Sequence, residues 1–161
     1  MFCVSISSEA IRKAVGHART GGSEQVIGFL IGRMQDQVLI IEDAVSGRIE
    51  AEEGRVVVPA VTIAKIADGI LTRRIKGNIV GWYHSHPGYG VFMSDRDVAT
   101  QKSLHQFSPY VVAMVIDSLT EEYSFFSMNC SSMTVAAFNE NDLYVHDSGE
   151  DPIPSSFKKR S

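Results

Sequence analysis

Two histidines, a serine and an aspartate lie close together in the stretch HSHPGYGVFMSDRD, which spans residues 84–97. His84 and His86 are two positions apart, so on an extended strand both imidazole rings point to the same face. Asp97 follows Ser94 by three positions, in what the pattern predicts is the first turn of a helix. Two imidazoles and one carboxylate leave the fourth position of a tetrahedral zinc ion open for water. Such an open position is typical of catalytic rather than structural zinc sites.

Zinc held in this way would support hydrolysis. It lowers the pKa of the water in the open position toward ~7 and polarises the carbonyl group under attack. A simpler alternative stays open, because Ser94 and Asp97 also have the spacing of a helix cap with an acidic first turn. An isolated pair of histidines is likewise often a surface accident. The combination of both pieces, joined by a bend at Pro87 and Gly88, favours the metal site over either piece alone.

The surrounding residues predict a strand that runs into a helix. The apolar run NIVGWY, residues 78–83, is typical of a buried strand and ends directly at His84. A helix is predicted to begin at Ser94 and to end before the SPY sequence at 108–110. The metal-binding residue types therefore lie where a strand end and a helix start are expected to meet.

The rest of the chain predicts an α/β domain. Apolar residues at helical spacing predict an opening helix that is capped at Ser7 and Ser8 and stopped by Gly21 and Gly22. Further strands are predicted over 26–33, 37–45, 110–117, 121–128 and 133–139, and a further helix over 61–77. This order favours a mixed, mostly antiparallel sheet flanked by about three helices. We expect the domain to cover 1–140, with a tail over 141–161 that is mobile in its last dozen residues.

Composition narrows the class of protein further. A chain of 161 residues with 44% apolar residues fits one domain, and a net charge of −4 argues against a nucleic-acid partner. No apolar run approaches the roughly 20 residues that span a bilayer, so no membrane association is expected. Cys3 and Cys130 form no CxxC pair, which argues against a disulfide framework and against a cysteine zinc site. The N-terminal residues lack the order of a signal peptide, and a cytoplasmic location is expected.

HSHPGYGVFMSDRD resembles the H-x-H-P-G…S-x-x-D signature of the JAMM (MPN+) metalloproteases, with seven residues between His86 and Ser94. The longer string GWYHSHPGYGVFMSDRDVATQKS is most similar to the proteasome-lid deubiquitinase and signalosome isopeptidase branches of that family. The resemblance covers roughly residues 5–140. It implies an MPN (JAMM) domain and zinc-dependent hydrolysis of the bond after the C-terminal Gly-Gly of ubiquitin or a ubiquitin-like protein.

The same resemblance assigns roles to individual residues. His84, His86 and Asp97 would be the ligands of one Zn²⁺ ion. Ser94 would hydrogen-bond the developing oxyanion or the attacking water. The implied partners are ubiquitin-type proteins and their conjugates, and a proteasome-like assembly is a further possibility. The sequence shows no long helical extension of the kind that docks the lid subunit, so independent action is expected.

The chain departs from the family pattern at the general base, which the family writes as a glutamate in E-x-x-G. The residue three places before Gly28 is Gln25, and Glu24 lies one place too early. Neighbouring side chains on a strand face opposite sides, so only one of the two faces the metal. Either Gln25 occupies the base position as an amide that cannot take a proton, or a bulge near Ser23 brings Glu24 to the site. A catalytically silent scaffold that retains the metal is the rival reading, and Gln25 is its support.

Two other segments have alternative interpretations. The bend between His86 and Ser94 is unusually apolar for a loop, with Tyr89, Phe92 and their neighbours. It either walls a groove for an extended C-terminal tail or packs against the following helix. The acidic stretch 48–55 is expected to be a solvated loop, with an insertion that moves over the substrate as the alternative.

Overall fold

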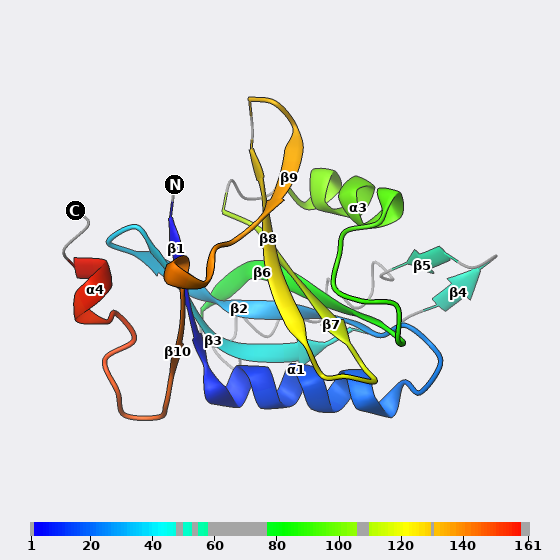
Figure 1. Cartoon of the computed structure of the whole chain (residues 1–161), viewed down its shortest axis with the longest axis horizontal. Helices are drawn as coiled ribbons and strands as arrows, with labels where there is room; N and C mark the ends of the chain where they lie inside the picture. Colours follow the sequence, from blue (N-terminus) through cyan, green and yellow to red (C-terminus); the bar gives the residue numbers. More distant parts are fainter. Residues whose placement is uncertain are drawn as a thin grey trace.

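The computed structural model describes residues 2–47, 50–52, 55–57, 77–105, 110–129 and 131–158. Its main element is an eight-stranded mixed sheet in the order β10-β1-β3-β2-β6-β7-β8-β9 (Figure 1). The strands are β1 (Cys3–Ser7), β2 (Ile27–Gln35), β3 (Val38–Ser46), β6 (Asn78–His86), β7 (Val112–Asp117), β8 (Tyr123–Asn129), β9 (Thr134–Ala137) and β10 (Leu143–His146). A separate antiparallel pair consists of β4 (Glu50–Glu52) and β5 (Arg55–Val57).

The expected fold class is confirmed. In the main sheet β2 pairs antiparallel with β3 and β6, and β8 pairs antiparallel with β7 and β9. The pairings β1·β3, β1·β10 and β6·β7 are parallel. The described helices are α1 (Ser8–Thr20), α3 (Asp95–His105), α4 (Ser155–Lys158) and the short 3₁₀ turn η1 (Glu140–Asp142). The helix predicted over 61–77 lies outside the described residues apart from Gly77.

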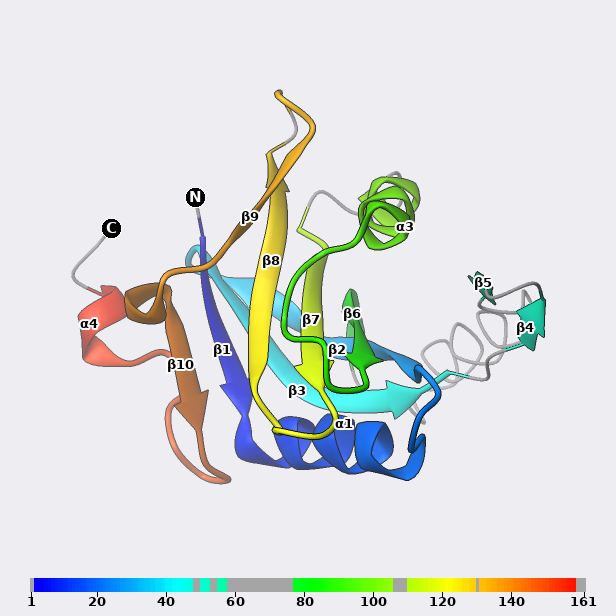
Figure 2. The ribbon, with the colours of Figure 1, turned by 45° about the vertical axis from the view of Figure 1, so that its right-hand side comes forward.

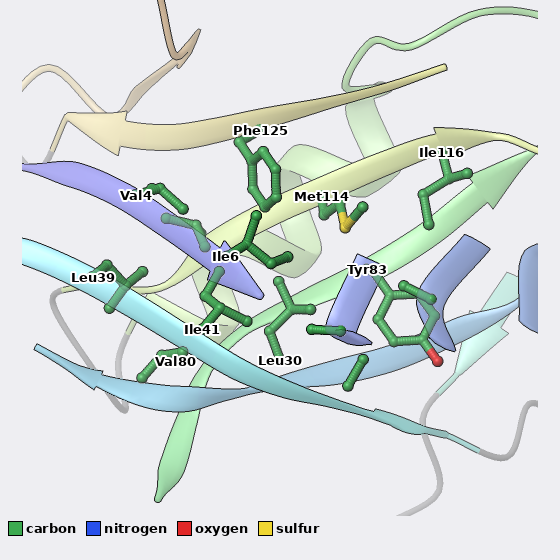
Figure 3. Close-up of a cluster of buried hydrophobic side chains, with 14 of the residues drawn as sticks. Val4, Ile6, Leu30, Leu39, Ile41, Val80, Tyr83, Met114, Ile116 and Phe125 are labelled. Carbon is green, nitrogen blue, oxygen red and sulfur yellow. The ribbon is translucent and has the colours of Figure 1, made fainter. Parts of the chain in front are cut away.

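Helix α1 covers one face of the sheet (Figures 1 and 2). Ser7 caps it as expected, because the Ser7 hydroxyl accepts the N–H of Ala10. Ala10, Ala14 and Ala18 are fully buried at spacings of four, so their small side chains let the helix lie close to the strands. Figure 3 shows the core beneath this helix, with the labelled side chains Val4, Ile6, Leu30, Leu39, Ile41, Val80, Tyr83, Met114, Ile116 and Phe125.

Helix α3 lies over the opposite face, on which a second apolar cluster is buried (Figure 2). The cluster consists of Ile27, Phe29, Ile31, Trp82, Val111, Ala113, Val115 and Phe126. Within α3 the buried side chains are polar, namely Asp97 and Gln101. Gln101 accepts the indole N–H of Trp82 at 2.6 Å and donates to the Val111 carbonyl at 2.8 Å. Polar contacts as well as apolar packing therefore dock α3 on the sheet.

The structure differs from the sequence-based expectation at both edges of the fold. Strand β1 was not predicted, and β10 forms within the expected tail and pairs parallel with β1. Beyond β10, Ile153 and Phe157 are buried against Val38 and Ile40. A short parallel edge strand whose partner is far away in sequence leaves no hairpin signal and little periodicity. The domain boundary at residue 140 stays a prediction.

The acidic stretch expected as a plain loop contains β4 and the start of β5. Over the ranges that the structure describes, every helix is too short or too polar to span a lipid bilayer.

Candidate metal centre

The three predicted metal-binding side chains come together between the end of β6 and the first turn of α3. His84 and His86 share the α3 face of β6, because side chains two apart on a strand point the same way. The Nε2 atom of His84 lies 2.9 Å from Asp97 Oδ2, and the Nε2 atom of His86 lies 3.2 Å from the same oxygen. All three residues are buried, and their ligand atoms lie within 4.8 Å of one another. The cluster has one carboxylate and two imidazoles, which is a donor set that zinc accepts.

The hydrogen bonds of His86 indicate that this cluster suits a cation. The Nδ1 atom of His86 lies 2.9 Å from the Gly90 carbonyl, which can only accept, so Nδ1 carries the ring hydrogen. In the neutral ring Nε2 then presents a lone pair to the lone pairs of the Asp97 carboxylate. Two acceptors at this distance attract one another only when a proton or a cation lies between them. A second partner that fixes the ring tautomer is the usual arrangement for metal-binding histidines.

His84 supports the same conclusion in a different way. Its Nε2 atom is close to Asp97 but outside the angles of a hydrogen bond, and within the described ranges neither ring nitrogen of His84 has a hydrogen-bond partner. Burial lowers the pKa of His84, so the neutral, metal-binding form is favoured. A buried nitrogen without a partner is costly unless a ligand satisfies it. A divalent ion held by Nε2 would do so.

Ser94 and Asp97 form the reciprocal helix cap that the simpler sequence interpretation predicts. The Ser94 N–H donates to Asp97 Oδ2 at 2.9 Å, and the Asp97 N–H donates to Ser94 Oγ at 3.2 Å. Burial alone would raise the pKa of Asp97, but the imidazoles of His84 and His86 and the Ser94 N–H together lower it. The cap and the cluster therefore coexist, because the same carboxylate oxygen faces both.

A stacked ring and a buried amide support the cluster from below. The Trp82 ring stacks on His84 with centroids 4.4 Å apart, and its indole N–H is held by Gln101. Gln101 lies four residues after Asp97, so both side chains leave the same face of α3. Sequence reasoning did not identify Gln101 as a site residue. Its only signal was this spacing from Asp97.

The pairing of β2 with β6 decides which early residue faces the cluster. Ile27 lies opposite His84, and Ser85 extends the pairing by one residue because its N–H donates to the Val26 carbonyl at 3.1 Å. The Val26 N–H in turn donates to Ser85 Oγ at 2.9 Å. Continued by one more residue, this register places Gln25 opposite His86, and directly opposed residues share a face.

Side-chain contacts agree with this register. Gln25 is half-buried, and its amide donates to the Tyr89 hydroxyl at 2.6 Å, whereas Glu24 is exposed. The register shifts that β2 shows lie between Leu30 and Gly32, and the described pairings place none near Ser23. The arrangement favours Gln25 over Glu24 at the base position, and the base role itself stays a prediction.

In the apolar bend between β6 and α3, some side chains are packed inward and others are exposed. Val91 and Met93 pack against the second apolar cluster, whose buried members come from the sheet side rather than from the following helix that the packing alternative names. Tyr89 and Phe92 are 50% and 46% exposed, and their ring centroids lie 4.8 and 4.9 Å from that of His86. Two partly exposed aromatic rings therefore flank His86, one of the candidate metal ligands.

Because several histidines are buried, we expect the stability of the metal-free protein to depend on pH. Burial lowers the pKa of His17, His84 and His146 below 6.5, so the unfolded chain binds protons near that pH that the folded chain does not. The free energy of unfolding should therefore fall between about pH 7.5 and about pH 5.5. The carboxyl groups of Asp97 and Asp117 do not contribute in this pH window. Their pKa is lowered by folding, so they stop stabilising the fold only when the pH falls below their ordinary pKa of 3.8.

Urea unfolding at the two pH values measures this effect. The His17 ring contacts the Tyr83 hydroxyl at 2.7 Å in the folded protein. His17→Gln removes this ring, so one fewer group titrates in the unfolded chain and the unfolding free energy should depend less steeply on pH. Equal unfolding free energies at both pH values would show that these rings ionise alike in the folded and unfolded states.

Comparison with known proteins gives a consistent picture of what the chain resembles. Residues 2–110 match the profile of a family described as JAB1/Mov34/MPN/PAD-1 ubiquitin protease. COP9 signalosome complex subunit 5a of Arabidopsis thaliana is 38% identical over 117 residues, which are 71% of this chain and 33% of that protein. COP9 signalosome complex subunit 5 of Drosophila melanogaster is 37% identical over 117 residues, which are 71% of this chain and 36% of that protein. The chain spans about a third of the length of the curated relatives it matches.

Proposed function

Because the chain belongs to the JAB1/Mov34/MPN/PAD-1 ubiquitin protease family, we propose that it is a zinc-dependent isopeptidase of the JAMM type. Its substrates would be ubiquitin or ubiquitin-like modifiers and their conjugates, cleaved after the C-terminal Gly-Gly. Processing of a modifier precursor at the same bond is part of the proposal. The family assignment supports a hydrolase, and the site supports the choice of metal and of reaction.

The observation that carries the proposal is the convergence of His84, His86 and Asp97 on one buried point. Nε2 of both histidines and the Asp97 carboxylate would hold the zinc. When bound there with an open position, zinc supplies Lewis acidity and a water of lowered pKa. The chain's own residues then decide how the substrate is held and where protons go.

Ser94 and the aromatic bend would act on the substrate. The Ser94 hydroxyl accepts the Asp97 N–H and still has its own O–H to donate toward an oxyanion beside the cluster. Tyr89 and Phe92 present exposed apolar surface next to His86. An extended chain without bulky side chains would pack against it. A tail that ends in Gly-Gly has this property, because only glycine brings its backbone so near a wall.

Gln25 limits the activity of this chain. Its amide can hold a water molecule, but it cannot accept the proton that a general base must take and pass to the leaving amine. We propose a base-substituted form that turns over slowly. The second candidate, a catalytically silent scaffold that retains the metal, rests on the same residue. We further propose a cytoplasmic location and a proteasome-like assembly as a partner, because the relatives named above are subunits of a complex.

Cleavage of a ubiquitin precursor that carries residues beyond Gly-Gly tests the proposal. The zinc-loaded protein and its Gln25→Glu variant are incubated with the precursor, and the products are identified by mass. We expect cleavage after Gly-Gly by Gln25→Glu, with loss of that cleavage on chelation and in a Gln25→Glu/Asp97→Asn double variant. Cleavage by neither form would overturn the enzyme proposal, and zinc binding without cleavage would favour the scaffold.

A further inference from the structure

Asp117 is a buried carboxylate that no role in the proposed reaction uses. It is the last residue of β7 and pairs with His86 across the parallel β6·β7 ladder. Only 3% of its surface is exposed. A charge buried to this extent is stable only when several donors compensate its lost hydration.

Four backbone N–H groups supply that compensation. Leu119 and Thr120, in the turn after β7, donate to Oδ1 at 2.9 and 3.3 Å. Gly88 donates to Oδ1 at 3.1 Å, and Gly90 donates to Oδ2 at 3.0 Å. Both of these glycines belong to the bend between β6 and α3. The carboxylate therefore ties the bend to the end of the neighbouring strand, and the four bonds lower its pKa against the effect of burial.

The bend needs such an anchor because its backbone is unusual. Gly88 and Gly90 have φ values of +86° and +91°, a region that side chains other than glycine rarely adopt. This conformation turns the Gly90 N–H toward Asp117 and lets the Gly90 carbonyl reach His86 Nδ1 at 2.9 Å. One peptide segment thus connects the Asp117 carboxylate to the imidazole of a candidate metal ligand.

We propose that Asp117 is a positioning residue of the metal centre, which orients His86 and selects its Nδ1–H tautomer through the Gly90 carbonyl. The inference rests on the proposed metal site. Asp117 Oδ2 sets the place of the Gly90 peptide, and the Gly90 carbonyl then holds the ring hydrogen on Nδ1. Nε2 is left with its lone pair toward Asp97. Partners of this kind raise metal affinity because the ligand is already in its binding geometry.

Asp117→Asn tests the proposal with little change in shape. An amide can keep its oxygen toward Leu119 and Gly88, but it then presents N–H₂ to the N–H of Gly90, and two donors repel. We expect the zinc affinity, measured by competition with a chromophoric chelator, to fall about 10- to 100-fold. Asp151→Asn is the matched control, since Asp151 also accepts a backbone N–H, from Ile153, but is exposed. Its zinc affinity should equal that of the parent.

A second measurement separates positioning from mere stabilisation. Correlations between ring hydrogens and ring nitrogens in the metal-free protein report the tautomer of His86. The parent should show a hydrogen on Nδ1, held by the Gly90 carbonyl, and Asp117→Asn should remove it from Nδ1 partly or wholly. An unchanged tautomer together with a zinc affinity within about twofold of the parent would overturn the proposal, even if the variant unfolds more easily.

Gly90→Ala tests the same connection if Asp117→Asn does not fold. The alanine disfavours the positive φ of Gly90 while Asp117 stays intact, so tautomer and affinity should change in the same direction. In the double variant the two effects on affinity should be less than additive. If Gly90→Ala leaves both readouts unchanged, the inference fails. A parent that binds no zinc would instead contradict the proposed function, and the tautomer readout does not depend on zinc.

Discussion

Gln25→Glu should raise the rate of precursor cleavage by the zinc-loaded protein about 10²- to 10⁴-fold, which is the usual contribution of a positioned general base. Glutamate has nearly the size and shape of glutamine, so it can occupy the same place opposite His86. The contact with Tyr89 can also survive. The Gln25 amide now donates to the Tyr89 hydroxyl, and a carboxylate would accept the hydrogen of that hydroxyl instead.

The pH profile distinguishes a restored base from a general improvement. With glutamate at position 25, activity should fall toward low pH as the carboxylate becomes protonated, whereas the parent has no such group at this position. Zinc affinity should be the same in both, because the base is not a ligand. Glu24→Ala should change neither chain, since Glu24 is exposed. Full activity in the parent that is lost only in Glu24→Ala would contradict the assignment of Gln25.

Gln101→Leu should lower the free energy of unfolding by about 2–6 kcal/mol, a large part of the roughly 5–15 kcal/mol of a typical domain. The buried amide satisfies the Trp82 indole N–H and the Val111 carbonyl together. Leucine fills a similar volume but leaves both groups without a partner, and each unsatisfied group costs about 1–3 kcal/mol. Urea unfolding of the metal-free protein measures the loss.

Zinc affinity should fall as well in Gln101→Leu, because α3 carries Asp97 and Trp82 stacks on His84. The matched control is Ser103→Ala, an exposed position on the same helix that should change stability by less than about 0.5 kcal/mol. A loss below about 1 kcal/mol in Gln101→Leu would mean that the Trp82 and Val111 groups find other partners.

Much of the candidate site could be predicted from local spacing. His84 and His86 share a face because a strand has a period of two, and Ser94 and Asp97 form a cap because a helix start has donors to satisfy. The opening helix followed from its cap at Ser7 and Ser8 and from apolar residues at helical spacing, including Ala14 and Ala18. These features depend on neighbours within a few residues, so the order of the residues is enough to predict them.

Other features depend on which distant segments lie side by side. The pairing of β1 with β10 joins residues 4–7 to residues 143–146, which are far apart in sequence. No local pattern marks a short parallel edge strand. Gln101 and Asp117 are also invisible as site residues in sequence, because their partners, Trp82 and Gly90, come from other elements. Hydrogen bonds of this kind are set by packing, which periodicity does not encode.

The contrast is clearest around the candidate metal ligands themselves. By itself, the sequence determined that two imidazoles, a carboxylate and a hydroxyl stand at the spacing of a strand end and a helix start. Only the tertiary structure favoured Gln25 over Glu24 on the His86 face, because the register between β2 and β6, continued beyond Ile27 and His84, sets which of two adjacent side chains shares that face. The same holds for the tautomer of His86, since the Gly90 carbonyl that selects it is placed by Asp117, across the neighbouring strand.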